Sequence, residues 1–443
     1  MKIIVAGAGN IGLVTALCFA EKGHQVFCVD IDQTKISKLK TGITSIFEPE
    51  LDILLSTHLK KGNIQFSGQF ESILNQSELI FITVGTPNDQ KGEIDLSAVE
   101  SVLVDVSRLT TTNSNTNSAA ITKTIIIKST VPPGTNKKLS EKYPNFKFIS
   151  SPEFLREGSA IYDCLNPDRI IIGSHPEHTN DDLKLFKNIY EQFGLAENKF
   201  IQMDTVTAEM TKYAANIFLA ARVSLMNEFS RVCEKAGADI ELLKKGLSLD
   251  HRIGNEFLNA GIGYGGSCFP KDLEAFNFYA TGLNENLKLT NAIRKTNDLQ
   301  LANFGFKIVA YHKAANIQNP TICLWGATFK PDTDDLREAP ALKLVALLLS
   351  RSFKLHIYDP KASSALTDLF KDEPNIKIFK NSYEALEGTD ALVIATEWNE
   401  FRSANPIEIK KHLKNPVIFD GRNLFSPPQM RELGFKYFSV GRP

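Results

Sequence analysis

The sequence predicts an α/β protein with two doubly wound domains joined by a long central helix. From residue 1 to about residue 205, short apolar runs alternate with helical patterns, which is typical of a parallel sheet covered by helices. The same alternation resumes after 316–320, and a long helical pattern separates the two blocks. We therefore expect domains at 1–205, 206–315 and 316–443.

The first block contains six runs that are apolar enough for buried parallel strands. In order, they are Lys2–Ala6, Gln25–Val29, Leu79–Val84, Thr124–Lys128, Lys147–Ile149 and Arg169–Ile172. Helical spacing predicts helices between them, at Ile11–Lys22, Leu96–Leu109 and Asp181–Gln192. The polar run Thr110–Ser118 has no apolar periodicity, so we expect a surface loop there.

The stretch from Thr207 to Gly237 contains no proline and no internal glycine. Its apolar residues keep the spacing of one helix face, at Met210, Ala214, Ile217, Ala221, Leu225 and Phe229. We interpret it as a connecting helix whose wide apolar face serves a dimer interface, although an ordinary core helix explains the pattern equally well. The last block then predicts strands and a helix, at Thr321–Trp325, Pro340–Leu349 (the helix), Lys354–Tyr358, Ala391–Ala395 and Pro416–Phe419.

The composition is that of a globular protein and excludes several functions. The 443 residues are 43% hydrophobic and 23% charged, and the formal net charge of −1 offers no overall attraction for nucleic acid or an anionic membrane. No stretch approaches the roughly 18 apolar residues of a membrane span, and glycines interrupt the apolar N-terminal run, so no signal peptide is expected. Six scattered cysteines favour a reducing cytoplasm. His175 and His178 lack the spacing of metal ligands, so we expect no metal.

A glycine-rich turn near the N-terminus predicts a dinucleotide site. Gly7, Gly9 and Gly12 form a GxGxxG pattern that follows the first predicted strand and opens the first helix. Such glycines allow a tight turn and a close approach of a pyrophosphate to the helix N-terminus. Asp30 ends the next strand, 18 residues after Gly12 (30 − 12), where a carboxylate accepts hydrogen bonds from the adenosine ribose. Because an acidic residue repels a 2′-phosphate, the pattern favours NAD over NADP.

The turn at 263–272, which reads GYGGSCFPKD, carries the most reactive group of the chain. Cys268 lies on a glycine-rich turn and is followed by Lys271 and Asp272. Glycines let a backbone approach a ligand closely, and a lysine favours the thiolate, the reactive form of the thiol. A buried structural cysteine is the alternative. Together with the dinucleotide pattern, the turn indicates a dehydrogenase that works through a covalent sulfur intermediate.

Several polar groups follow predicted strands and so belong to the carboxyl edge of the first sheet, where ligands bind in such folds. They are Thr86 in the GTP turn, Thr130 in 129–135 and Glu153 in 151–158. By itself Thr130 fits a simple turn, and Glu153 fits a helix start that interacts with the helix dipole. On the long helix, Lys212 and Asn216 are four residues apart and share a face. A functional pair and a solvated stripe explain them equally well.

Eight ordered motifs give the chain a resemblance to the UDP-glucose/GDP-mannose dehydrogenase family, whose members oxidise a sugar alcohol to a carboxylate with two NAD. The motifs are GxGxxG, GTP, STVPPGT, SPEFLREG, KYxxN, GGSCFPKD, FKPDTDD and DGRN. They run from the N-terminus to 420–423, so the resemblance covers essentially the whole chain. It implies a Rossmann-like fold for both doubly wound domains, with NAD in the first and the UDP-sugar in the last.

The resemblance also implies catalytic roles. Cys268 resembles the nucleophile that captures the aldehyde as a thiohemiacetal, which is then oxidised to a thioester. Lys212 and Asn216 resemble the groups that stabilise the oxyanion. Asp272 and Thr130 resemble groups that position a water and assist proton transfer, and Glu153 resembles the carboxylate of thioester hydrolysis. The base of the first step stays open between Lys212, Asp272 and water.

Ligand contacts follow from the same resemblance. The implied cofactor contacts are Gly7, Gly9, Asn10, Ile11, Gly12, Asp30, Lys35, Thr86, Thr130, Glu157, Lys271 and Arg337. The implied substrate contacts are Glu153, Phe154, Leu155, Arg156, Lys212, Asn216, Arg252, Phe257, Gly261, Tyr264, Gly265, Phe329, Lys330 and Arg422. Arg252 resembles an arginine that reaches a neighbouring subunit's site, which implies an obligate homodimer.

Within the family, the segments 166–169 and 261–264 and the full FKPDTDD motif look more like the UDP-glucose branch. We therefore expect oxidation of UDP-glucose to UDP-glucuronate, with a GDP-mannose 6-dehydrogenase as the alternative. The intact Cys268, Lys212, Asn216 and Asp272 argue against a catalytically silent NAD-binding regulator. Two departures lie in the cofactor domain: Asn10 stands where many relatives carry an aromatic residue, and Lys91 stands where Asp is usual.

Overall fold

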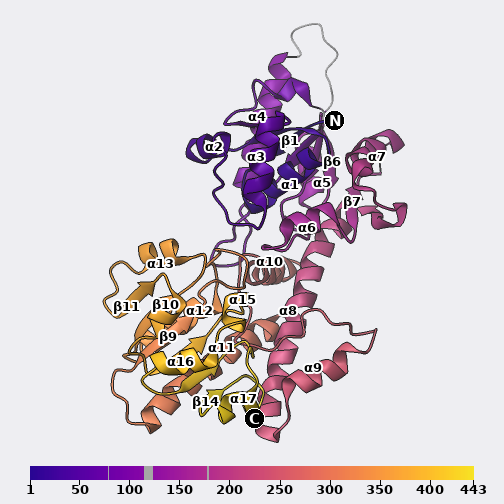
Figure 1. Ribbon diagram of the computed structural model, residues 1–443. Helices are drawn as coiled ribbons and strands as arrows, with labels where there is room; N and C mark the ends of the chain where they lie inside the picture. The colour runs from indigo at the N-terminus through magenta and orange to yellow at the C-terminus, as the bar shows by residue number, and fades with distance from the viewer. Residues whose placement is uncertain (78, 114–122, 177–178) are drawn as a thin grey trace. The chain divides into compact units, whose positions relative to one another are not determined.

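The computed structural model describes residues 1–77, 79–113, 123–176 and 179–443 (Figure 1). The chain forms two compact units, one comprising Met1–Ala215 with Glu274–Gly282 and the other comprising Asn216–Leu273 with Leu283–Pro443. Each unit contains one sheet. The division into three domains at 205 and 315 stays a prediction.

The sheet of the first unit has eight strands in the order β3-β2-β1-β4-β5-β6-β7-β8. Its first six strands have the order of the dinucleotide-binding doubly wound fold. The strands are β1 Lys2–Ala6, β2 Gln25–Val29, β3 Ile64–Ser67, β4 Leu79–Ile82, β5 Thr124–Ile127, β6 Lys147–Ser150, β7 Ile170–Ser174 and β8 Phe200–Asp204.

The predicted direction of one strand is wrong. β7 pairs antiparallel with β6, at Ser150 and Gly173, whereas a parallel strand was expected at Arg169–Ile172. The intervening helix α6 (Ala160–Leu165) has 6 residues, which span about 9 Å at 1.5 Å per residue. A helix this short does not return the chain along the whole sheet, so β7 starts at the carboxyl edge and runs the opposite way.

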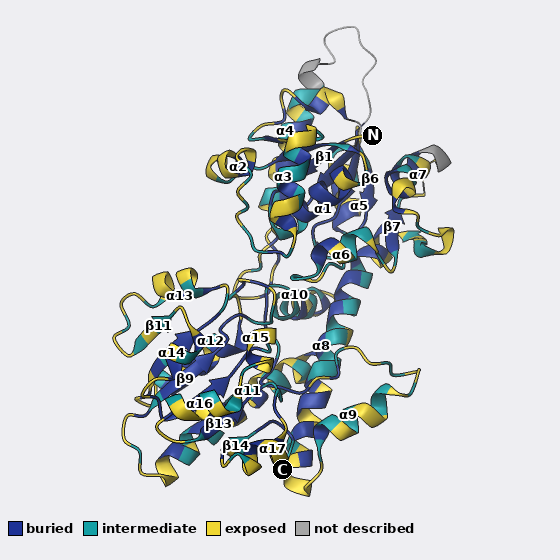
Figure 2. Cartoon of the chain, in the orientation of Figure 1, coloured by how far each residue is buried: buried dark blue, intermediate teal, exposed yellow. Residues whose placement is uncertain are grey.

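The remaining helices of the first unit cover both faces of its sheet. They are α1 Asn10–Glu21, α2 Gln33–Lys40, α3 Leu51–Lys61, α4 Ser97–Asn113, α5 Thr135–Lys142 and α7 Asn180–Lys187, with 3-10 turns at Leu74–Gln76, Asn188–Phe193 and Glu197–Lys199. Alternate residues of β1 enter different cores: Ile3 and Val5 pack on one face, and Ile4 and Ala6 on the other. The inner strands are accordingly dark blue in Figure 2.

The polar run at 110–118 is in part helical. Helix α4 extends to Asn113, four residues beyond the predicted end at Leu109. The loop prediction is therefore wrong for 110–113. Within this last turn the hydroxyl of Thr110 donates to the carbonyls of Val106 and Ser107, so the polar side chain is satisfied without leaving the helix. The rest of that prediction, 114–118, lies outside the described residues.

The sheet of the second unit repeats the same topology with six parallel strands, in the order β11-β10-β9-β12-β13-β14. The strands are β9 Thr321–Trp325, β10 Lys354–Tyr358, β11 Ile376–Phe379, β12 Ala391–Ile394, β13 Val417–Asp420 and β14 Lys436–Phe438. The helices are α9 Ile240–Ser248, α11 Lys288–Ala314, α12 Pro340–Leu349, α13 Ser363–Leu369, α14 Ser382–Leu386, α15 Asn399–Arg402, α16 Pro406–His412 and α17 Pro427–Glu432.

Two helices pass from one unit into the other. Helix α8 (Thr205–Ala236) has 32 residues, about 48 Å at 1.5 Å per residue, and α10 (Phe269–Gly282) begins next to Cys268. The long central helix predicted from the sequence is therefore confirmed. Within the described ranges, no helix is long and apolar enough to cross a membrane.

Candidate active site

The glycine-rich turn after β1 leaves space beside the N-terminus of α1. Gly7 has φ +106°, and its N–H donates to the Val29 carbonyl at 2.7 Å. A Cβ at Gly12 would lie 1.8 Å from the Gly7 oxygen, so this glycine is required for packing. A Cβ at Gly9 would meet nothing within 4 Å. The turn therefore has the open space and the helix N-terminus that a pyrophosphate needs.

Asp30 stands beside this turn as an ionised acceptor. Its Oδ2 accepts the Ala8 N–H at 2.8 Å and the Lys35 ammonium at 3.0 Å. Partial burial opposes ionisation, but hydrogen bonds from Asp32, Ala8 and Lys35 hold the pKa of Asp30 below its usual value. The predicted cofactor residues Asp30 and Lys35 thus form one ion pair next to the glycines. An ionised carboxylate here suits the ribose hydroxyls of NAD.

Two neighbouring turns at the carboxyl edge of the first sheet are joined by a hydrogen bond. The hydroxyl of Thr86 donates to the Thr130 carbonyl at 2.7 Å. Ser129, next to Thr130, donates its hydroxyl to the Val84 carbonyl at 2.7 Å. The structure therefore brings together Thr86 and Thr130, which the sequence placed after different strands.

A buried ion pair lies in the same unit. Nζ of Lys212, on α8, donates to Oε1 of Glu153 at 2.8 Å, and both side chains are at most 6% exposed. Burial raises the pKa of Glu153, but the Lys212 ammonium and the Leu155 N–H outweigh it and hold that pKa below its usual value. Glu153 is thus a carboxylate with a proton-accepting role open to it, and the turn at 151–158 is not merely a helix start.

The aromatic ring of Phe154 has two cations near it. The guanidinium of Arg169 is 3.6 Å from its centroid and the Lys212 ammonium is 5.5 Å away. Arg156 instead makes a bidentate ion pair with Asp163, at 2.9 and 2.7 Å, on the surface. Glu157 is half-buried in the turn before α6. Of the predicted residues in this turn, Glu153 and Phe154 contact Lys212.

In the second unit, Cys268 lies immediately before α10. Its carbonyl accepts the Asp272 N–H at 2.8 Å, and its Sγ is 3.6 Å from the Ser267 hydroxyl. The thiol is half-buried, and none of the six cysteines is in a disulfide. The N-terminus of a helix favours a thiolate over a thiol. Cys268 is thus a half-buried thiol at a helix N-terminus, and its role as a nucleophile stays a prediction.

Asp272 is the centre of a small polar cluster one turn further along α10. It is 1% exposed, and its Oδ2 accepts the Asn216 amide at 2.6 Å. The ammonium of Lys271 binds its Oδ1 at 2.8 Å. The lysine predicted to favour the thiolate is therefore hydrogen-bonded to Asp272. Asn216 is buried, so it is not part of a solvated stripe, and its functional role stays a prediction.

The glycines around Cys268 have a packing function that the sequence did not reveal. A Cβ at Gly265 would lie 2.2 Å from the Glu338 carbonyl, and one at Gly266 would lie 2.7 Å from the Phe329 ring. The Gly266 N–H donates to the Arg337 carbonyl at 3.0 Å. These glycines therefore let the turn lie directly on 329–338, the segment that carries three of the predicted ligand contacts: Phe329, Lys330 and Arg337.

Two asparagines missed by the sequence reasoning hold the same turn. The buried Asn227 accepts the Gly261 N–H at 2.8 Å through Oδ1. Asn297 accepts the Tyr264 N–H at 2.8 Å and donates to the Tyr264 carbonyl at 3.0 Å. Both lie in long helices, Asn227 in an apolar stretch and Asn297 among polar residues, so no pattern in the sequence set Asn297 apart.

The predicted substrate arginines have distinct surroundings. Arg422 donates to the Ala395 carbonyl at 2.7 Å and to the Gly263 carbonyl at 3.3 Å, and so joins the DGRN segment to the turn before Cys268. Arg252 pairs with Asp250 and is 78% exposed. Phe257, nearby, has φ +60°.

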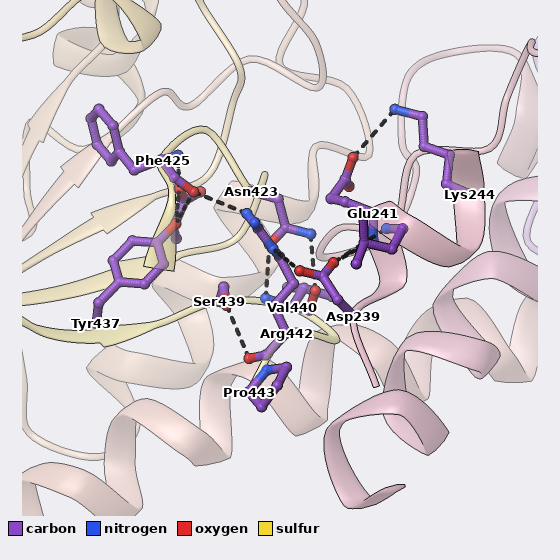
Figure 3. Close-up of polar contacts among 12 residues, drawn as sticks. Asp239, Glu241, Lys244, Asn423, Phe425, Tyr437, Ser439, Val440, Arg442 and Pro443 are labelled. Atoms are coloured by element: carbon purple, nitrogen blue, oxygen red, sulfur yellow. Dashed lines mark hydrogen bonds and ion pairs between the residues drawn. The ribbon is translucent and has the colours of Figure 1, made fainter. Parts of the chain in front are cut away.

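The C-terminal residues hold the DGRN segment in place (Figure 3). Arg442 lies between the Asp239 carboxylate at 3.2 Å and the Phe425 carbonyl at 3.0 Å. Asn423 exchanges two hydrogen bonds with the Val440 backbone, at 2.9 and 3.0 Å. Because Asp239 caps α9, this network joins the DGRN segment to the helix that precedes Arg252.

Comparisons with known proteins match the chain along almost its whole length. Three family models match, described as the UDP-glucose/GDP-mannose dehydrogenase family NAD binding domain, central domain and UDP binding domain, at residues 1–194, 206–299 and 323–427. The chain belongs to the UDP-glucose/GDP-mannose dehydrogenase family. It is an NAD-dependent dehydrogenase, and the predicted family, fold class and cofactor are confirmed.

Individual relatives agree with this assignment. UDP-glucose 6-dehydrogenase TuaD of Bacillus subtilis is 38% identical and covers 100% of this chain and 93% of its own. UDP-glucose 6-dehydrogenase of Pseudomonas aeruginosa is 38% identical, with 100% and 98% covered. A UDP-glucose dehydrogenase structure from Pyrobaculum islandicum has a TM-score of 0.87 at 29% identity, covering 100% of this chain and 98% of that chain.

Proposed function

We propose that this enzyme oxidises UDP-glucose to UDP-glucuronate with two NAD and one water, through a thioester on Cys268. The observation that carries the proposal is the similarity of the whole chain to curated UDP-glucose 6-dehydrogenases at 37–38% identity, together with a matched UDP binding domain. The alternative substrate, GDP-mannose, is not favoured by these relatives.

The residues of the first turn fit NAD. Gly9 leaves open space before α1, and Asp30 is held ionised where the adenosine ribose is bound in such folds. Bound NAD supplies the hydride acceptor for both oxidations. Thr86 and Thr130, joined by their hydrogen bond, line the adjoining turns.

The proposed reaction proceeds in three stages. The C6 alcohol loses a hydride and a proton to become an aldehyde, and Cys268 Sγ then bonds to the aldehyde carbon. The resulting thiohemiacetal loses a second hydride and its hydroxyl proton, which leaves a thioester. Water adds to the thioester carbon, the carbon–sulfur bond breaks, and the Cys268 thiol returns with the free carboxylate. Covalent capture divides a difficult oxidation and retains the aldehyde.

The buried polar groups supply the proton and charge chemistry. We propose that Lys212 and Asn216 stabilise the oxyanions that form at the sugar carbon. Glu153, as a carboxylate, accepts a proton from the attacking water. Asp272, held by Asn216 and Lys271, orients the groups around Cys268. Lys212, Asp272 and water remain the candidate bases for the first step.

We also propose that the enzyme is a homodimer. Three large apolar side chains on α8 are exposed at intervals of seven residues: Phe218 at 74%, Leu225 at 51% and Val232 at 60%. Repeats of seven place residues on one helix face, so these form a stripe suited to a second copy. Light scattering is expected to give twice the chain mass, and Leu225→Glu is expected to give a monomer.

The further proposals concern location and domain organisation. Six cysteines outside disulfides suit a reducing cytoplasm. We propose three functional parts, namely NAD binding at 1–205, a central helical part at 206–315 and UDP-sugar binding at 316–443. The family models support them, since they match within these ranges.

The test is the stoichiometry of NADH. Limiting UDP-glucose with excess NAD is expected to give two NADH per sugar, and GDP-mannose is expected to give little turnover. Cys268→Ala is expected to abolish turnover while NAD still binds. One NADH per sugar, or a fully active Cys268→Ala enzyme, contradicts the proposal.

A further inference from the structure

Two buried lysines bracket strand β5. Lys123 precedes the strand and is 2% exposed, and Lys128 follows it and is 7% exposed. Lysines are almost never buried to this extent without partners. The ammonium of Lys123 donates to the Leu74 and Ser77 carbonyls, each at 2.7 Å, which explains its burial by local structure. Lys128 lies at the other end of the strand, at the carboxyl edge.

The sheet fixes Lys128 next to the turn that carries Glu153. The Lys128 N–H donates to the Ile82 carbonyl at 2.9 Å. Ile127 pairs with Ser150, and the Ser151 N–H donates to the Ile127 carbonyl at 2.9 Å. Lys128 therefore stands one position beyond this pair, beside 151–153.

The charges that act on Lys128 come from four neighbouring segments: the turn at 151–158 and the helices α8, α6 and α1. Glu153 and Lys212 belong to the buried ion pair, and Cys164 on α6 and Cys18 on α1 are the other titratable groups. Burial lowers the pKa of Lys128, and Cys164 and Glu153 partly oppose that shift. Lys128 acts on Glu153 in turn. Two cations favour the ionised form of Glu153, first Lys212 and then Lys128.

The proposed chemistry makes this second cation necessary. Lys212 is the ion-pair partner of Glu153, yet the proposed mechanism also asks it to stabilise the oxyanion on the substrate. A buried carboxylate that loses its cation takes up a proton rather than stay charged. Glu153 would then be unable to accept a proton from water at the step where it is needed.

We propose that Lys128 is a positioning residue whose buried ammonium keeps Glu153 ionised while Lys212 serves the substrate. The inference rests on the proposed function, because it assigns Lys212 and Glu153 the roles given above. Lys128 acts through charge across the low-dielectric interior of the first unit. Arginine at this position is expected to retain the effect, and a neutral side chain is expected to lose it.

The experiment measures kcat against pH for the wild type and for Lys128→Met, Lys128→Arg and Lys123→Met. Removing a cation raises the pKa of a nearby carboxyl, so in Lys128→Met the acidic limb of the profile is expected to move up by about one pH unit. Lys128→Arg is expected to restore the wild-type limb. Lys123→Met, which removes a buried lysine from the other end of the same strand, is expected to lower Tm and leave the limb in place.

Two further variants identify the group whose titration produces the shift of the acidic limb. In Glu153→Gln the titrating carboxyl is gone, so adding Lys128→Met is expected to have no further effect on the pH dependence of residual turnover. When Cys164→Ser is combined with Lys128→Met, the acidic limb is expected to move as far as in Lys128→Met alone, because the Cys164 thiol is not the group that titrates. If Lys128→Met does not fold, Lys128→Gln takes its place.

The outcomes separate the two proposals. A wild-type enzyme that releases two NADH per sugar, with an unmoved limb in Lys128→Met, overturns the role of Lys128 alone. A limb that moves as far in Lys123→Met does the same, since it indicates a general effect of lost stability. A wild-type enzyme that does not oxidise UDP-glucose overturns the proposed function instead.

Discussion

The turn after β1 and the turn after β9 are built from the same parts. In each, a glycine with positive φ follows the strand, and its N–H donates to the last carbonyl of the neighbouring strand: Gly7 to Val29 at 2.7 Å, and Gly326 to Tyr358 at 2.8 Å. In each, an aspartate after that neighbouring strand accepts the next N–H at 2.8 Å. These are Asp30 with Ala8, and Asp359 with Ala327.

The two turns differ in what they leave accessible. Asp30 is half-buried, whereas Asp359 is 0% exposed and accepts hydrogen bonds from five donors: the N–H groups of Ala327, Thr328, Lys361 and Ala362 and the Thr328 hydroxyl. Helix α1 starts at Asn10, directly after the first turn, but α12 starts only at Pro340. The second turn therefore lacks an accessible carboxylate and an adjoining helix N-terminus. Shared strand order does not by itself make a dinucleotide site.

The largest expected effect comes from the two aspartates. Asp359→Ala leaves several buried N–H groups without an acceptor and is expected to lower the free energy of unfolding by about 4 kcal/mol. Asp30→Ala is expected to cost about 1 kcal/mol in stability and to weaken NAD binding by roughly 10- to 100-fold. Urea denaturation and NAD titration measure both. Equal losses of stability in the two variants, or normal NAD affinity in Asp30→Ala, would contradict the distinction between a structural Asp359 and a ligand-binding Asp30. If Asp359→Ala does not fold, Asp359→Asn replaces it.

A second buried carboxylate of the first unit extends the comparison. Glu209 accepts the N–H groups of Gly134 and Asn136 at 2.6 and 2.8 Å, and so closes a turn as Asp359 does. Burial raises the pKa of Glu209 to about 7, well above that of an ordinary glutamate, although the N–H groups favour the ionised form. Because this pKa is raised on folding, the stabilisation is complete below about pH 4.5 and is lost as the pH rises through about 7.

Glu209→Gln is therefore expected to change the pH dependence of stability. Between pH 5 and 8, the wild type is expected to lose up to about 3 kcal/mol relative to the glutamine variant. Urea denaturation at both pH values measures this difference. The control is Glu197→Gln, a side chain that is 77% exposed. If the free energy of unfolding of the wild type falls no more than that of Glu209→Gln between pH 5 and 8, Glu209 does not titrate in this range.

The glycines offer a smaller and sharper test. A Cβ at Gly12 meets the Gly7 oxygen, and one at Gly326 meets the Thr396 side chain at 2.5 Å. Gly12→Ala and Gly326→Ala are both expected to lower the free energy of unfolding by about 2 kcal/mol. Gly9→Ala is expected to change it by less than about 0.5 kcal/mol while weakening NAD binding. Thermal melts with and without NAD separate these effects. Unchanged NAD affinity in Gly9→Ala would show that the pyrophosphate does not bind beside Gly9.

The sequence predicted the inner strands of both sheets and missed all four edge strands. β3, β8, β11 and β14 lie at the ends of the two sheets, and their residues are largely half-buried or exposed. An edge strand packs against fewer neighbours, so it lacks the continuous apolar run that made β1 and β9 recognisable. The reversal of β7 was missed because strand direction depends on the path of the connection.

The candidate site was predicted as motifs but not as contacts. Glycine patterns and the residues after strands indicated the turns that carry Asp30, Thr130 and Cys268. The Glu153–Lys212 ion pair joins residues 59 apart in the chain, and no local pattern indicates such a partner. Lys128 was read only as the end of a strand. Its burial beside an ion pair is a property of the folded sheet.

The most direct test of the central claim is mass spectrometry of the acid-quenched enzyme. The Glu153→Gln variant is mixed with UDP-glucose and NAD, quenched and digested. Because hydrolysis of the thioester is proposed to need Glu153, a sugar-nucleotide adduct is expected to accumulate on the peptide that contains Cys268, with two NADH formed per adduct. NADH formation without any adduct, or an adduct on another cysteine, would contradict the account.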